Sequence, residues 1–227
     1  MEKVYSGKTK DVFLNTSGTY TLKLKDDATG KNGVFDPGEN SVGLNIKGLG
    51  RESLKLTAYF FCLLNKNGIP NHFLSCDIEE VTMEVIANKT FGSGLEFLCR
   101  LKADGSFVKR YGSYITYGDD LGYLVEATLK DDARQDPPIT QDTLAVLGIM
   151  TPQDYECCKE LTKKAAGLIA KDLSSKGLSM HDIKFEFGKK DGKVMLIDEI
   201  SAGCMRVYNN GEIIAPMDLG RLVLQSP

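Results

Sequence analysis

Short runs in which polar and apolar residues alternate dominate the first part of the chain, and this period of two is typical of β-strands. β-branched and aromatic residues are common in these runs, and turns that contain glycine separate them. The pattern predicts strands at residues 4–5, 11–14, 20–25, 79–86 and 95–101. We therefore expect a β-sheet in this part of the protein.

Two other segments carry apolar residues at the spacing of an α-helix. Residues 53–67 have this pattern and stop at Gly68, a residue suited to the left-handed conformation that ends many helices. A longer helix is predicted with Thr151 as its N-cap and a proline in its first turn, and it ends before Gly177. Residues 30–50, which are rich in glycine and asparagine, are predicted to form a loop.

A strictly alternating strand follows at residues 181–188. Its apolar residues share one face and pack into the core, whereas Asp182, Lys184 and Glu186 share the other face. A row of charges is costly to bury unless it meets water, a ligand or a metal ion. On this strand alone, a solvated charged face explains the pattern as well as a binding cleft does.

The next apolar run, residues 193–197, ends directly at Asp198, where a buried strand emerges. We predict a three-residue connection, residues 190–192, with Gly192 in the left-handed conformation. This connection places Glu186 and Asp198 on one face as diagonal neighbours, close enough to share one ion. A two-residue turn would place them on opposite faces. Magnesium prefers a few carboxylate oxygens together with water and phosphate, so the pair is a candidate Mg²⁺ site.

Cations that could face nucleotide phosphates occur at the other end of the chain. Lys8 and Lys10 lie beside Gly7 between two predicted strands, in the manner of a lid over phosphates. The sequence there is not a P-loop, because the first glycine, the buried strand and the following helix are absent. A polar hairpin without a ligand is the alternative.

Two arginines are candidates for binding a carboxylate or a phosphate, since a guanidinium presents paired donors. Arg100 precedes the turn Gly105-Ser106, whose amide and hydroxyl could hold an anion. Arg206 lies beyond Asp198 in a stretch that contains glycine. For either arginine alone, a surface salt bridge is the alternative.

The composition narrows the class of protein. The formal net charge of -3 over 227 residues gives no reason to expect a nucleic-acid partner, and a small-molecule substrate fits better. The longest apolar run, residues 57–64, is too short to span a membrane, and residues 1–10 are too polar for a signal peptide. We therefore expect a cytoplasmic protein.

The six cysteines show no disulfide framework, and the two histidines, far apart in sequence, give little support for a histidine metal site or a Ser-His-Asp triad.

Seven motifs in a fixed order make nearly the whole chain resemble the SAICAR synthetase family, the phosphoribosylaminoimidazole-succinocarboxamide synthases. These motifs are Tyr5-Ser6-Gly7-Lys8-Thr9-Lys10, Lys25-Asp26-Asp27-Ala28-Thr29, Asn67-Gly68-Ile69-Pro70-Asn71-His72, Arg100 with Gly105-Ser106-Phe107-Val108-Lys109-Arg110, Leu129-Lys130-Asp131-Asp132-Ala133 with Asp136, Asp182-Ile183-Lys184-Phe185-Glu186-Phe187-Gly188, and Asp198-Glu199-Ile200-Ser201 with Arg206. Any one of them is a weak signal, and the ordered set is a strong one.

The resemblance implies an α+β fold in which a small β-rich lobe, residues 1–84, and a larger α/β lobe, residues 85–227, enclose an ATP cleft. It also implies an ATP-dependent ligase of purine biosynthesis. ATP phosphorylates the carboxylate of 5-amino-1-(5-phosphoribosyl)imidazole-4-carboxylate, and the amine of L-aspartate then displaces phosphate to form an amide. Self-association into a homo-oligomer is left open.

The resemblance also assigns roles to residues. It implies that Lys8 and Lys10 face the ATP phosphates, that Glu186 and Asp198 hold Mg²⁺, and that Met83 and Val85 lie where backbone groups meet adenine. Substrate-binding roles fall to Arg100, Ser106, Arg206, Lys130 and Asp132, and catalytic roles fall to Asp182, Lys184 and Arg206.

Some positions differ from the family's usual pattern. Ala202-Gly203 stands where Pro-Asp is usual, and Val207-Tyr208 replaces the usual Leu-Trp. The motifs for ATP and metal are therefore better preserved than those that select the substrates. Two alternatives follow, namely a paralogous carboxylate-amine ligase with a different substrate and a nucleotide-binding module without turnover.

Overall fold

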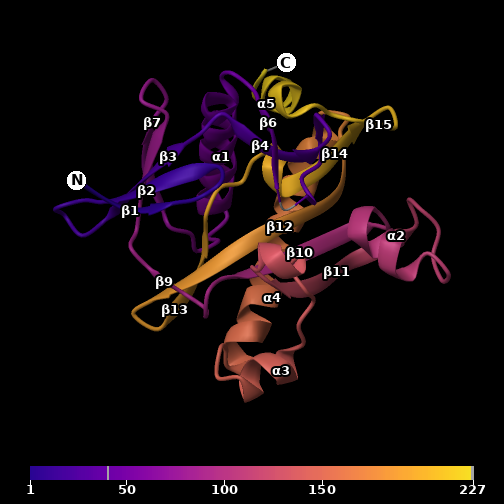
Figure 1. Cartoon of the computed structure of the whole chain (residues 1–227). Helices are drawn as coiled ribbons and strands as arrows, with labels where there is room; N and C mark the ends of the chain where they lie inside the picture. The colour runs from indigo at the N-terminus through magenta and orange to yellow at the C-terminus, as the bar shows by residue number, and fades with distance from the viewer. Residues whose placement is uncertain (40, 226–227) are drawn as a thin grey trace.

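The computed structural model describes residues 1–39 and 41–225, and it contains three antiparallel sheets and five α-helices in that part of the chain (Figure 1). The N-terminal sheet has the order β1-β2-β3-β8-β7. Its strands are β1 (Glu2–Ser6), β2 (Lys10–Leu14), β3 (Tyr20–Leu24), β8 (Thr82–Val85) and β7 (Phe73–Asp77). The predicted strands at 11–14 and 20–25 are confirmed. Of the predicted strand at 79–86, only β8 forms, because residues 78–81 make the turn after β7.

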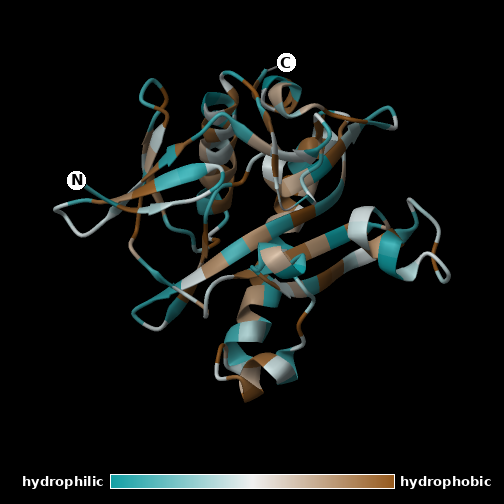
Figure 2. Cartoon of the chain, viewed as in Figure 1, coloured by the Kyte–Doolittle hydropathy of each residue, from teal (hydrophilic) through white to brown (hydrophobic). Residues whose placement is uncertain are grey.

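A larger sheet holds the strictly alternating strand at its centre. Its order is β11-β10-β12-β14-β15, and β13 and β9 also pair with β12. The strands are β9 (Lys89–Thr90), β10 (Leu95–Lys102), β11 (Asp120–Leu129), β12 (Ser179–Lys190), β13 (Lys193–Ile197), β14 (Met205–Asn209) and β15 (Glu212–Ile213). Brown apolar and teal polar positions alternate along β12 in Figure 2, as the sequence predicts.

The predicted loop at residues 30–50 is wrong in part. A three-stranded sheet of order β5-β4-β6 occupies much of it, with β4 (Asp27–Lys31), β5 (Val34–Phe35) and β6 (Val42–Asn45). Two glycines allow the close approach of these strands, because a side chain at Gly30 or Gly43 would collide with the neighbouring backbone. The glycines that suggested a loop therefore serve strand pairing.

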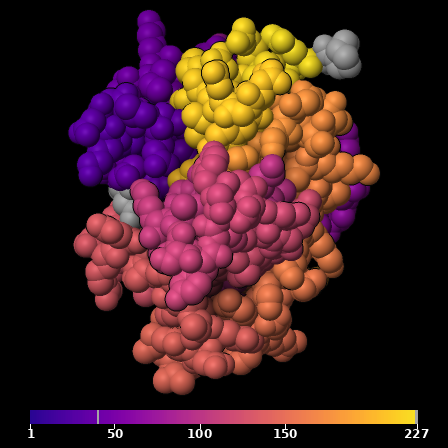
Figure 3. Space-filling view, turned by 90° about the vertical axis from the view of Figure 1, so that its right-hand side faces the viewer, coloured from indigo at the N-terminus to yellow at the C-terminus, as the bar shows by residue number. Residues whose placement is uncertain are grey.

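Two long helices pack against the sheets, and shorter ones lie at the edges. The helices are α1 (Leu49–Lys66), α2 (Gly105–Tyr111), α3 (Gln141–Val146), α4 (Pro152–Ser175) and α5 (Pro216–Leu224). The α4 helix begins as predicted, since the Thr151 hydroxyl accepts from the backbone N–H of Asp154. The α5 helix packs on α1, so the C-terminal segment lies against the N-terminal part (Figure 3).

One continuous cluster of buried apolar side chains joins these elements. It includes Leu22 and Met83 from the N-terminal sheet, Phe61 from α1, and Phe97 and Phe185 from the larger sheet. The α+β fold predicted from the sequence is confirmed. The division at residue 84 into two lobes stays a prediction.

Candidate active site

A pocket of about 570 Å³ separates the N-terminal sheet from the larger sheet. Lys8, from the turn between β1 and β2, and Lys10, the first residue of β2, lie on one wall, and the opposite wall carries Glu186 from β12 and Asp198 from the end of β13. The structure thus brings together four side chains that the sequence analysis singled out from both ends of the chain.

Asp198 and Glu186 converge, although the predicted connection between their strands is wrong. The register pairs Lys190 with Lys193, so the turn has two residues, and both Asp191 and Gly192 have positive φ angles. In a regular strand this turn would place Asp198 on the face opposite Glu186. The strand ends at Ile197, however, and Asp198 takes the left-handed conformation with φ of 71°. This local reversal brings its carboxylate back to the cleft face.

The buried His72 contacts Asp198 at this point. The Nε2–H group of His72 donates to the backbone carbonyl of Asp198 over 3.0 Å, because a carbonyl can only accept. Burial lowers the pKa of His72 to about 4, so the imidazole is neutral at pH 7. No role for His72 was expected from the sequence. In the structure its hydrogen bond helps to hold Asp198 in the left-handed conformation.

Two lysines neighbour the carboxylates. Lys10 forms an ion pair with Asp198, and Lys130 forms one with Glu186. Burial would raise the pKa of Asp198, yet the charges of Lys10 and Lys130 hold it well below its usual value. Burial and the adjacent charge of Asp198 raise the pKa of Glu186 to about 7. Glu199 lies 4.0 Å from Lys10 and has a raised pKa for the same reasons, burial first.

The donors in this pocket fit a magnesium ion. Three carboxylates, Glu186, Asp198 and Glu199, lie near two lysines, so the group carries surplus negative charge. Burial contributes most to the raised pKa of Glu186 and the charge of Asp198 adds to it; a divalent cation would relieve the repulsion between the two carboxylates. Among residues 1–39 and 41–225, no group of three or more His, Cys, Asp or Glu side chains is arranged as a cage that could hold a metal ion. Magnesium does not require such a cage, since water and substrate phosphates usually complete its shell.

Lys8 reaches across the mouth of the same pocket. Its ammonium lies 2.6 Å from the Asp132 carboxylate, on the 3₁₀ turn Asp132–Arg134. The predicted phosphate ligand and a predicted substrate ligand therefore contact each other here. Asp136 also lines the pocket, and its carboxylate accepts from the backbone N–H of Asp131 over 2.6 Å.

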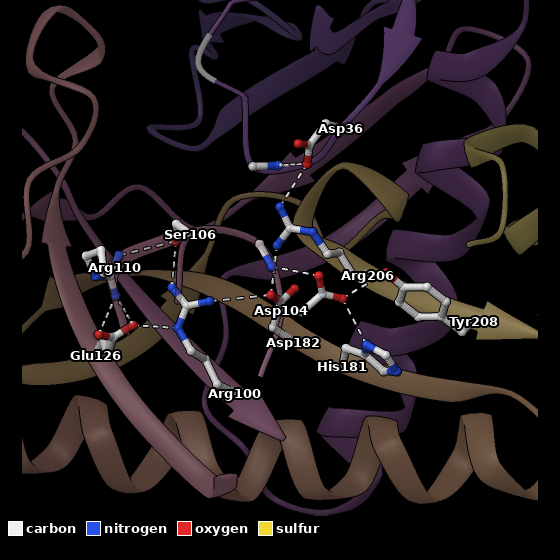
Figure 4. Close-up of polar contacts among 12 residues, drawn as sticks. Asp36, Arg100, Asp104, Ser106, Arg110, Glu126, His181, Asp182, Arg206 and Tyr208 are labelled. Carbon is white, nitrogen blue, oxygen red and sulfur yellow. Dashed lines mark hydrogen bonds and ion pairs between the residues drawn. The ribbon is translucent and has the colours of Figure 1, made fainter. Parts of the chain in front are cut away.

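A second pocket, of about 600 Å³, opens on the same side of β10 and β12. The register of these strands pairs Arg100 with Asp182, so their side chains emerge on one face. Arg100, Arg206 and Ser106 line the pocket, as the sequence analysis expected of an anion site. Figure 4 shows the three residues and their partners.

Each arginine of the second pocket is held by acidic groups. Arg100 is 1% exposed; it pairs with Glu126 and donates to the Ser106 hydroxyl over 3.0 Å. Arg206 donates to Asp182 and to Asp36, each over 2.8 Å. Neither arginine is a surface salt bridge, so that alternative is wrong for both.

Lys184 lies where the two pockets meet. It lines both pockets, and its ammonium lies 2.8 Å from the buried carboxylate of Glu96 on β10. Burial would lower the pKa of Lys184, but the charge of Glu96 outweighs that effect and raises it. Glu96 also lines both pockets, so the two spaces form one cleft with an ion pair at its centre.

Two predicted residues lie outside the cleft. Met83 and Val85 are buried in the core, and β8 is paired on both sides by β3 and β7. Neither residue lines the two pockets. An adenine contact at Met83 or Val85 stays a prediction that this geometry does not favour.

Several acidic partners of the predicted cations were assigned no role from the sequence, and two of them, Asp36 and Glu126, lie outside the linings of both pockets. Glu96, Asp36, Glu126 and Glu199 each pair with a predicted cation. Two of them had a signal: Glu199 directly follows Asp198 where the strand emerges, and alternation along the predicted strand at 95–101 places Glu96 on the same face as Arg100. Among residues 1–39 and 41–225, no helix has the length and apolar character to cross a membrane.

Comparisons with known proteins identify relatives of this chain in both sequence and structure. The SAICAR synthetase family model matches residues 3–217. A phosphoribosylaminoimidazole-succinocarboxamide synthase from Clostridium tetani is 53% identical over 227 residues, which cover 99% of this chain and 100% of that protein. A solved SAICAR synthetase in complex with ADP is 29% identical, with a TM-score of 0.83 over 96% of this chain and 90% of that one. A synthase from Ehrlichia chaffeensis is 25% identical, with a TM-score of 0.84 over 98% of this chain and 92% of that one.

The fold, the joined pockets and these matches define the class of protein as an ATP-dependent ligase. More narrowly, the chain belongs to the SAICAR synthetase family, whose members act in purine biosynthesis.

Proposed function

We propose that this enzyme joins the carboxylate of 5-amino-1-(5-phosphoribosyl)imidazole-4-carboxylate to the amine of L-aspartate, with ATP and Mg²⁺. The observation that carries the proposal is the single cleft made of two pockets. One pocket presents lysines and paired carboxylates, the other presents Arg100, Arg206 and Ser106, and Lys184 lies between them. An acyl phosphate requires a triphosphate and a carboxylate to meet in such a place.

The first pocket supplies the groups that phosphoryl transfer needs. Lys8 and Lys10 offset the charge of the ATP phosphates, and Glu186 and Asp198 would hold Mg²⁺. Bound there, the ion neutralises charge that develops on the transferred phosphoryl group. Lys130, which pairs with Glu186, orients that carboxylate and adds a positive charge.

The second pocket suits the phosphorylated acid. Arg100, Arg206 and Ser106 offer donors for a phosphate, and Asp182 holds both guanidinium groups in place, with distances of 3.5 and 2.8 Å. The buried position of these arginines strengthens their attraction for an anion, since little water screens it.

Lys184 is the group best placed to act on the reacting carboxylate. Its ammonium faces the junction of the pockets, and Glu96 keeps it charged by raising its pKa. A fixed positive charge there stabilises the negative charge on the carboxylate as the phosphoryl group arrives. Loss of Lys184 should therefore affect turnover more than the binding of either substrate.

A paralogous ligase with another substrate is the second candidate function. The observation that favours it is the position of Gly203, which lines the first pocket where the family usually has an aspartate. Cys204, the next residue, lines both pockets. A change at this point alters the wall nearest the incoming amine or acid.

The test is an assay of ADP and amide formation with purified enzyme. The proposal predicts Mg²⁺-dependent product only when ATP, the aminoimidazole ribonucleotide carboxylate and L-aspartate are all present. Product with a different acid or amine and none with this pair would favour the paralogue. If the protein binds nucleotide but forms no ADP in any mixture, it is a nucleotide-binding module without turnover. We also propose a cytoplasmic location, in line with purine biosynthesis.

A further inference from the structure

The guanidinium of Arg206 lies in a slot between two glycines from different segments. A methyl group at Gly105, the first residue of α2, would lie 2.7 Å from Cζ of Arg206. A methyl group at Gly38 would lie 2.2 Å from its Nη2. Both distances are far below van der Waals contact, so the arginine occupies space that any other residue at these positions would fill.

The position of Gly105 depends on Asp104, which is 6% exposed. Oδ1 of Asp104 accepts from the backbone N–H of Gly105 over 2.6 Å. Its Oδ2 accepts from the Tyr208 hydroxyl over 2.8 Å and from Nδ1–H of His181 over 2.9 Å. The rings of His181 and Tyr208 are stacked with centroids 3.9 Å apart. Figure 4 shows the hydrogen bonds of Asp104 to Gly105, His181 and Tyr208.

Asp104, His181 and Tyr208 line neither pocket. Their hydrogen bonds therefore do not contact a ligand directly, and they act on the neighbouring start of α2. The backbone N–H held by Asp104 belongs to the residue that contacts Arg206. The next residue, Ser106, accepts from Arg100. One carboxylate therefore fixes the start of α2, and the start of α2 contacts Arg100 and Arg206 of the second pocket.

We propose that Asp104, held by His181 and Tyr208, is a positioning residue that fixes Gly105 and thereby aligns Arg206 and Ser106 for the substrate anion. The inference rests on the proposed function in one respect, that the second pocket receives the phosphorylated acid. Asp104, His181 and Tyr208 would then influence binding of the substrate through Arg206, without contacting the ligand themselves.

The first test compares two glycine variants of the full-length enzyme. Gly105→Ala adds a methyl group against Arg206, whose flexible end can move, so the fold should survive while the guanidinium shifts. Gly122→Ala is the matched control. Gly122 has a similar φ of 59°, against 51° for Gly105, but a methyl group there meets no atom within 4 Å. Both substitutions place alanine at a positive φ and so cause similar backbone strain, but only Gly105→Ala adds a group that collides with Arg206.

We expect Gly105→Ala to raise the KM and the calorimetric Kd of the aminoimidazole ribonucleotide carboxylate about tenfold or more, since misplacement by about 1 Å has effects of that size. The KM of ATP should stay within about twofold, because the first pocket is untouched. Asp104→Ala should move the same two quantities in the same direction, and Gly122→Ala should move neither.

Three results would overturn the inference: unchanged ribonucleotide Kd in both Gly105→Ala and Asp104→Ala, an equal rise in the KM of ATP, or an equal effect of Gly122→Ala. Thermal unfolding of each variant confirms that folded protein is compared. If the wild type binds the ribonucleotide without forming product, the proposed function fails, and the Kd comparison still decides the inference.

Discussion

Asp198 combines a left-handed backbone, a partly buried carboxylate and an ion pair with Lys10. Aspartate and asparagine adopt the left-handed conformation more easily than most residues, because their short polar side chains bond locally. The residue type thus serves both the reversal of the chain and the proposed binding of the metal ion.

We expect Asp198→Asn to lower kcat by about 100-fold or more, a loss typical of removing one electrostatic stabiliser of the transition state. The free energy of unfolding should change by less than about 1 kcal/mol, because asparagine keeps the shape and Glu186 and Glu199 still balance Lys10 and Lys130. Steady-state kinetics and urea unfolding measure the two effects. Equal loss of activity and stability would count against a role in the cleft.

His72 makes stability depend on pH. Its pKa is about 4 in the folded protein and near 6.5 in the unfolded chain, so the unfolded state binds the extra proton between these values. The stability that neutral His72 contributes is present above pH 6.5 and is lost as the pH falls towards 4. The loss approaches roughly 3 kcal/mol, since each pKa unit corresponds to about 1.4 kcal/mol.

The measurement for His72 is the free energy of unfolding from pH 4 to pH 8, for the wild type and for His72→Gln. Glutamine can still donate to the Asp198 carbonyl, but it does not titrate. The difference between the two proteins should shrink as the pH falls below 6.5. A constant difference across the range would show that His72 does not titrate in this window.

At the scale of elements, α1 shows why a helix boundary can be hidden in a sequence. The helix begins at Leu49, four residues before the predicted start, because its first turn is capped by Asp26. The Asp26 carboxylate accepts from the backbone N–H groups of Gly48 and Gly50, over 2.9 and 3.0 Å. A cap supplied from 22 residues upstream leaves no local signal at the helix itself.

We expect Asp26→Ala to lower the free energy of unfolding by about 1–2 kcal/mol, since two backbone donors lose their acceptor. Asp27→Ala is the control. The Asp27 carboxylate accepts from the Asn45 side chain at an exposed position, and its loss should cost less than about 0.5 kcal/mol. Chemical denaturation of the two variants gives the comparison, and equal losses would refute the capping role.

The strands and their faces could be predicted from the sequence, because alternation records which side is buried. Asp182, Lys184 and Glu186 share the cleft face of β12, as expected. The turn after β12 could not be predicted in length, since Asp191-Gly192 suits both a two-residue and a longer connection. Glu186 and Asp198 still converge because Asp198 leaves the strand geometry, which alternation cannot show.

At the scale of the whole molecule, the cleft depends on contacts between distant parts of the chain. Lys8 meets Asp132 across 124 residues, Lys184 meets Glu96 across 88, and Arg206 meets Asp36 across 170. No periodic pattern records such pairs. The cations and Asp132 could be selected by motif, whereas the pairing of each cation with its acidic partner became visible only in the folded chain.

Because the two pockets are joined yet distinct, ATP and the ribonucleotide should bind at the same time. We expect ADP to inhibit competitively against ATP and non-competitively against the ribonucleotide, as inhibition patterns at saturating L-aspartate would show. Competition between ADP and the ribonucleotide would mean that both occupy one pocket.

The most direct test of the account is the location of a divalent ion in a crystal soaked with Mn²⁺ and ADP. Anomalous scattering from manganese marks the ion independently of the surrounding atoms. We expect a peak within bonding distance of both Glu186 and Asp198, with the nucleotide phosphates beside Lys8 and Lys10. A peak elsewhere in the cleft, or bound ADP with no metal at these carboxylates, would contradict it.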